Sequence, residues 1–148
     1  EEIGNEPLEQ EKYLVRNAKK MVLLAAGIAV QKYMQKIEKE QEILVRLANM
    51  GGEIFNMESA VLRTEKAIQS TGADKNELKR LYTEVYVQEA FNRIENWAKE
   101  ILIAVEEGDS LRMMLSALRK LTRHNPINTI AKNRQIAKTI IENEKYVV

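Results

Sequence analysis

The chain lacks most of the residues on which catalytic and metal chemistry depends. It contains no cysteine, a single histidine (His124), and no glycine-rich loop of the kind that binds phosphate. The missing cysteines exclude disulfides and thiolate metal sites and are typical of a reducing compartment, so we expect a cytoplasmic protein. A di-iron centre in a helical bundle needs Glu-x-x-His pairs on facing helices. One histidine is too few for such a centre, so we expect no metal ligands.

Long apolar runs and aromatic residues are also scarce. The longest uncharged run, residues 21–31, is shorter than the ~20 residues that a membrane-spanning helix needs. Position 1 is Glu, and no basic and then apolar leader precedes the first predicted helix, so we expect no signal peptide and a fragment of a longer protein. Aromatic residues make up only 5% of the chain. Few bases could stack on so few rings, and we expect no nucleic-acid partner.

Positive and negative charges are nearly equal in number, but they are unevenly distributed along the chain. The net charge is +1, yet acidic residues dominate the first twelve positions and basic residues dominate beyond Leu111. An alternative function is therefore a stand-alone helical protein-interaction module whose basic C-terminal third binds an acidic partner. The bases of that third are Arg112, Arg119, Lys120, Arg123, Lys132, Arg134, Lys138 and Lys145.

What the chain does have is helical apolar periodicity almost from end to end. Short connections between long helices indicate antiparallel neighbours. We therefore predict an all-α fold, an antiparallel up-and-down bundle of four to five helices, with residues 1–148 as a single helical domain. The first predicted helix begins near Pro7, the second covers about residues 39–70, and the third covers about residues 74–107. The fourth follows Gly108-Asp109, and the fifth follows Asn125-Pro126.

Two of these helices make specific predictions about packing. The first is apolar on all sides between Met21 and Val30, so we expect it to be enclosed on several sides and to be the central helix. The second carries an apolar seam that Gly51 and Gly52 interrupt without shifting its register. The glycines fit a hinge, a kink or a close helix crossing, and the unbroken register favours the crossing. The seam consists of Ile43, Leu47, Met50, Ile54, Met57, Val61 and Ile68.

The ends and faces of the later helices are predicted in the same way. Gly72 is expected to end the second helix in a left-handed conformation, with Asp74 and Glu77 forming a capping box for the third. Asn125 is expected to cap the fifth helix, with Pro126 at its first position. The third helix is expected to bury the stripe Leu78, Tyr82, Tyr86, Ala90, Ile94, Trp97, Ile101 and Val105. Its solvated face is expected to carry Lys79, Glu84, Arg93, Glu95 and Glu100, and the fifth helix is expected to bury Ile130, Ala137, Ile140 and Ile141.

Three titratable side chains merit inspection as functional groups. Glu58 and Glu89 are the carboxyls nearest to apolar faces, but partial exposure with a salt-bridge partner such as Arg63 or Arg93 is the favoured interpretation. His124 lies at a helix end, where a charged or hydrogen-bonded surface imidazole is expected. The methionines Met21, Met50, Met57, Met113 and Met114 are expected to fill gaps in the core rather than to form a partner groove. We therefore expect no catalytic, cofactor-binding or metal-binding residue in this chain.

One stretch of the second predicted helix carries a family resemblance. The residues that carry it are Glu40-Gln41, Ile43-Leu44-Val45, Leu47-Ala48-Asn49, Glu53-Ile54-Phe55, Met57, Ala60, Leu62-Arg63 and Ala67. The stretch resembles the C-terminal helical extension of acyl-CoA dehydrogenases of the very-long-chain type, and the segments Tyr13–Lys20 and Asn125–Ala137 resemble bacterial members.

The resemblance implies a function for a longer protein. Members of this family are FAD-dependent acyl-CoA dehydrogenases of fatty-acid β-oxidation, and their catalytic glutamate lies in a Tyr-Glu-Gly-Thr motif that this chain does not contain. The resemblance therefore implies that FAD and the catalytic base belong to the parent enzyme and that this fragment alone is not an enzyme. Such an extension packs on the catalytic module and supports the dimer. It is membrane-associated in mitochondrial members, but no segment here has the character of an interfacial anchor.

Two expectations follow from these alternatives. A domain of this kind, isolated from its parent, should expose an apolar patch and self-associate. An enzyme in its own right would instead require a buried carboxyl at Glu58 or Glu89 with a perturbed pKa.

Overall fold

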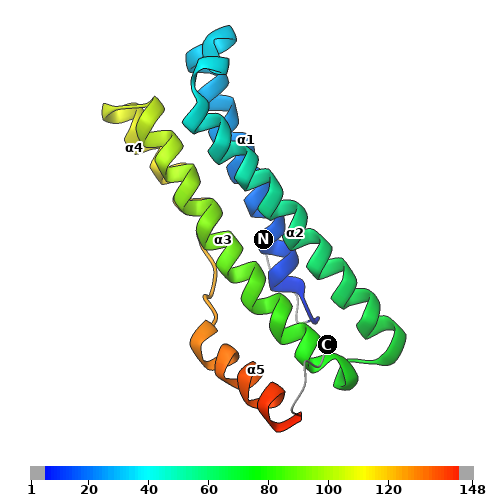
Figure 1. The fold of residues 1–148 in the computed structure, drawn as a ribbon. Helices are drawn as coiled ribbons and strands as arrows, with labels where there is room; N and C mark the ends of the chain where they lie inside the picture. Colours follow the sequence, from blue (N-terminus) through cyan, green and yellow to red (C-terminus); the bar gives the residue numbers. More distant parts are fainter. Residues whose placement is uncertain (1–5, 144–148) are drawn as a thin grey trace.

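The computed structural model describes residues 6–143, which fold into five α-helices and two short 3₁₀ helices (Figure 1). No strand occurs within these residues, and the predicted all-α class is confirmed. The α-helices are α1 (Glu9–Tyr33), α2 (Gln41–Thr71), α3 (Glu77–Val105), α4 (Gly108–Thr122) and α5 (Thr129–Asn143), and the 3₁₀ helices are η1 (Met34–Lys39) and η2 (Asp74–Asn76).

The helices form an up-and-down bundle centred on α3. Helices α1, α2 and α3 lie side by side and run in alternating directions, and α4 returns along α1 and α3 (Figure 1). Helix α5 continues in the direction of α4 and, among the described elements, packs on α3 alone. Because α3 contacts all four other α-helices, it is the central helix, and the prediction that the first helix is central is wrong.

The core forms where the apolar stripes of α1, α2 and α3 meet. The α2 seam is buried or half-buried at every predicted position, and the stripe of α3 is likewise turned inward. These spacings place each set on one side of its helix, which is why the sequence alone located them. The largest side chains that are almost completely buried are Phe91, Leu14, Met21, Met50, Met57, Ile94, Ile101, Leu102 and Leu118.

The apolar second half of α1 is not enclosed on several sides, contrary to expectation. Leu23 is 72% exposed and Val30 is 52% exposed, whereas Met21, Ala25 and Ala29 are fully buried. The neighbours of α1 are α2, α3 and α4, and they cover only the side of the helix that carries the buried residues.

Glycine and asparagine, rather than the predicted capping box, shape the turn between α2 and α3. Gly72 has the expected positive φ of 91°, and its N–H donates to the carbonyl of Ile68 at 2.8 Å. Asp74 lies in η2 and does not cap α3. The buried side chain of Asn76 instead donates to the oxygens of Ala67, Thr71 and Gly72 at 2.6–3.0 Å. This one amide therefore ties the start of α3 to the last turn of α2 and closes the turn.

Helix α5 begins later and faces a different way than predicted. Its first turn is capped by Asn128, whose Oδ1 accepts a 3.0 Å hydrogen bond from the N–H of Ala131, so Asn125 and Pro126 precede the helix. Ile136 is buried against α3, and the predicted Ile140 is half-buried beside it. The other predicted core residues, Ile130, Ala137 and Ile141, are exposed because α5 has only one neighbour.

Gly51 and Gly52 lie on the exposed side of α2, and the predicted close helix crossing within the domain is wrong. A Cβ atom added to either glycine would meet nothing within 4 Å. The helix runs through both residues without interruption, so they form no helix break either. Both glycines lie on the side of the helix away from the buried residues Met50 and Ile54, where no neighbouring helix packs.

Candidate functional site

The single histidine is a structural contact rather than a surface group. His124 is half-buried, its Nδ1 lies 2.6 Å from the carbonyl oxygen of Thr122, and its Nε2 lies 3.1 Å from the side-chain amide oxygen of Gln88. Its ring packs edge-on against Phe91, with 5.1 Å between the centroids. The expected hydrogen bonds are present, but the imidazole is half-buried rather than at the surface, because the segment after α4 folds back over α3 at this point.

The two carboxyls singled out from the sequence do not form a site. Glu58 pairs with Lys19 of α1 at 3.0 Å, not with Arg63, and both side chains are nearly half exposed. Glu89 is half-buried on α3, and its expected partner Arg93 donates to Glu53 of α2 instead. Neither carboxyl has the desolvated environment that a general acid or base requires.

Among residues 6–143 the buried carboxyl is that of Glu11, which the sequence reasoning missed. It is 6% exposed, and burial raises its pKa above the usual value. It borders an open cleft of about 430 Å³ together with Arg80, Glu84 and Lys132, where Lys132 donates to Glu84 at 2.6 Å. A signal was available in the sequence, since Glu11 precedes Leu14 by three residues and so lies on the buried stripe of α1.

A second polar cluster joins α2 to α3. Arg93 donates two hydrogen bonds of 3.1 Å to the carboxylate of Glu53, and the Tyr86 hydroxyl donates a third of 2.8 Å. Burial disfavours the Glu53 carboxylate, but the bonds from Arg93 and Tyr86 outweigh burial and lower its pKa. The same pairing raises the pKa of Arg93. The cluster therefore links α2 to α3, and the positive charge of Arg93 offsets the negative charge of Glu53.

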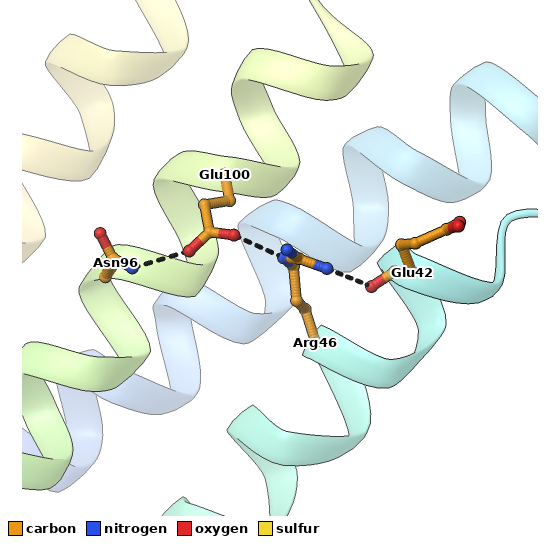
Figure 2. Close-up of polar contacts among 4 residues, drawn as sticks. All are labelled: Glu42, Arg46, Asn96 and Glu100. Carbon is orange, nitrogen blue, oxygen red and sulfur yellow. Dashed lines mark hydrogen bonds and ion pairs between the residues drawn. The ribbon is translucent and has the colours of Figure 1, made fainter.

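A third cluster fastens the start of α2 to the last turns of α3 (Figure 2). Arg46 donates to Glu100 at 2.7 Å and to the backbone carbonyl of Glu42 at 3.0 Å, and Asn96 donates to the other oxygen of Glu100 at 2.7 Å. The face of α3 predicted to be solvated is thus half-buried at Glu84, Arg93 and Glu100, because each of these residues pairs with another helix.

Within residues 6–143, no group of three or more His, Asp and Glu side chains is arranged to hold a metal ion. None of the helices in this range combines the length and apolar character that crossing a bilayer requires.

The remaining feature with a potential for function is exposed apolar surface. On α1 it comprises Leu23 and Val30, followed by Met34, which is 72% exposed. On α4, Met113 is 67% exposed, so it does not fill a gap in the core as predicted. On α2, Val45, Phe55 and Leu62 are more than half exposed on the side away from the core. Large apolar side chains gathered on the outside of a helix are typical of an interaction surface.

Comparison with known proteins identifies the family. Residues 17–120 match the family model described as "Acyl-CoA dehydrogenase, C-terminal domain". The chain belongs to this family. The acyl-CoA dehydrogenase C-terminal domain is also 63% identical, over all 148 residues, to a "Probable acyl-CoA dehydrogenase" of Bacillus subtilis (strain 168), of which it covers 25%.

A solved structure gives the same result for the fold. The C-terminal domain superposes with a TM-score of 0.97 and 63% identity on an acyl-CoA dehydrogenase from Bacillus anthracis whose crystal structure is described as complexed with FAD. The match covers 100% of this chain and 25% of that one. The chain therefore spans a quarter of the length of both relatives, and the family resemblance inferred from the sequence is confirmed.

Proposed function

We propose that this domain is a non-catalytic part of a longer FAD-dependent acyl-CoA dehydrogenase of fatty-acid β-oxidation. In that enzyme it packs on the catalytic module and supports association between subunits. The observation that carries the proposal is the coverage: the whole chain corresponds to only 25% of relatives that are named as acyl-CoA dehydrogenases, one of them in complex with FAD. The other three quarters of the enzyme leave room for the flavin site and the catalytic base.

The contacts within the domain support a structural role. The polar clusters at Glu53 and Glu100 are used to hold α2 against α3. Large apolar side chains on the outer faces of α1 and α2, by contrast, are left exposed. Covering apolar surface is the ordinary driving force for association between domains and subunits. We propose that the chain is a single domain and that the parent enzyme is homo-oligomeric and cytoplasmic. FAD is bound by the parent rather than by this fragment. We propose neither a nucleic-acid partner nor membrane attachment.

The test compares the longer enzyme with a version that lacks this domain. We expect both to carry FAD and to bleach its absorption with an acyl-CoA, while the shortened version forms smaller or less heat-resistant assemblies. Unchanged assembly and unchanged heat resistance would contradict the packing role. A native protein of only 148 residues without flavin would favour the alternative, a stand-alone interaction module, whose binding to an acidic partner should weaken with salt.

A further inference from the structure

The outer face of α2 is uncharged from Val45 to Leu62. The three charged residues in this stretch all turn toward neighbouring helices, since Arg46 and Glu53 pair with α3 and Glu58 pairs with α1. Along the outer face, small and apolar residues recur in steps of three and four, beside the exposed amides of Asn49 and Asn56. This α2 stripe consists of Val45, Ala48, Gly52, Phe55, Ser59 and Leu62.

The stripe has the pattern of a coiled-coil seam, although its large apolar residues are left exposed by the described residues 6–143. Steps of three and four residues place side chains along one line of a helix. Val45, Phe55 and Leu62 are 54%, 71% and 59% exposed. Helix α2 thus carries two seams on opposite sides, and only the inner one has a partner in the fold.

Gly52 has no packing reason within the described part of the domain. A glycine weakens the middle of a helix. Within this fold there is room for a side chain at Gly52, because an added Cβ would meet no atom within 4 Å. On the α2 stripe, however, it leaves a hollow between Ala48 and Phe55. A large side chain from a partner would fit into that hollow and approach the backbone closely.

We infer that two copies of this chain pair through the α2 stripe, with the helices antiparallel around a two-fold axis between Gly52 and Phe55. In this register Phe55 of each copy fills the hollow at Gly52 of the other, Val45 meets Leu62, and Ala48 meets Ser59. The largest side chain of the stripe thus meets its glycine, and the seam is self-complementary, as a two-fold interface requires. A parallel pairing would instead place Phe55 against Phe55.

Charges at the two ends of the stripe favour the same arrangement. Glu42 is exposed just before the stripe, and Arg63 and Lys66 are exposed just after it. In the antiparallel register, Glu42 of one copy lies beside Arg63 and Lys66 of the other, whereas a parallel register would bring like charges together. The inference deepens the proposed function, because it names the surface through which the domain supports subunit association.

The first test measures the association of the 148-residue chain by sedimentation equilibrium. We expect a concentration-dependent dimer that Phe55→Glu weakens at least about tenfold, because the two-fold axis brings both substituted residues into one interface. The matched control is Met113→Glu, which replaces a similarly exposed residue on α4 and should leave the dimer unchanged. A monomeric wild-type chain, or an equal effect of both substitutions, would overturn the inference. Circular dichroism verifies that both variants are folded.

The second test determines the register, and the absence of cysteine from the chain makes it direct. A mixture of Ala48→Cys and Ser59→Cys chains should form a disulfide-linked dimer under mild oxidation. Ala48→Cys alone should link far less efficiently. Equal linkage in both samples, or linkage of Ala48→Cys alone, would overturn the antiparallel pairing. Such a failure would leave the proposed function standing, because the length and flavin content of the native enzyme do not depend on this contact.

Discussion

Replacing Gly51 and Gly52 with alanine should stabilise the folded chain. Both residues lie inside α2, neither has a positive φ, and an added Cβ would meet nothing within 4 Å. Neither a clash nor backbone strain therefore offsets the gain in helix propensity, which is about 1 kcal/mol per residue. The double substitution should raise the free energy of unfolding by about 2 kcal/mol. A domain of this size should then melt roughly 4–8 °C higher.

The assay is chemical and thermal denaturation, at a protein concentration low enough to keep the chain monomeric. Gly72→Ala is the matched control, because this glycine has a φ of 91° and a ψ of 160°. Alanine is strained in that region, so this substitution should lower stability by about 1–3 kcal/mol. A double variant at Gly51 and Gly52 that is less stable than the wild-type chain would refute the reasoning, because it would require a close contact that the fold does not contain.

Three further predictions concern buried groups. Phe91→Ala should lower the free energy of unfolding by about 3–5 kcal/mol in chemical denaturation, because it empties a fully buried site. The hydrogen bonds from Arg93 and Tyr86 outweigh burial and lower the pKa of Glu53 from 4.5. The ionised carboxylate should therefore stabilise the fold above pH 4.5, and this stabilisation should be lost as the pH falls through the folded pKa. Glu53→Gln should flatten that part of the plot of stability against pH. The pKa of Glu11 is raised from 4.5, so stability should fall as the pH rises from 4.5 through its folded pKa. Glu11→Gln should therefore be more stable than the wild-type chain at neutral pH, and a less stable variant would contradict this account.

Helix periodicity made much of the fold predictable. The seam of α2, from Ile43 to Val61, and the inner stripe of α3 follow from spacing alone, because a regular helix converts sequence position into direction around its axis. The same rule would have placed Glu11 on the buried face of α1. It was missed because a carboxyl in an acidic segment is ordinarily exposed.

The spacing of residues along one helix does not show which residues of other helices each side chain contacts. The prediction that Glu84, Arg93 and Glu100 are solvated is wrong, because other helices reach that face of α3 and pair with them. Likewise, Asn76 and His124 acquire their contacts from residues that the turns bring close in space. Such contacts depend on the placement of whole helices, which periodicity within one helix does not specify.

The exposed apolar residues were mispredicted for a related reason. A run such as Met21 to Val30 shows that all sides of a helix are apolar, but not that the domain itself covers all of them. Leu23 and Val30 are exposed because only part of α1 faces other helices of the chain. If the domain is a quarter of a larger enzyme, the cover for such surfaces lies outside it.

The central claim, that this domain belongs to a longer flavoenzyme, is tested most directly on the native protein. An antibody raised against the chain would capture it, and its length and visible absorption spectrum would then be recorded. The account predicts a polypeptide about four times as long as this chain, in line with its 25% coverage of both relatives, with the absorption of bound flavin. A colourless protein no longer than 148 residues would contradict it.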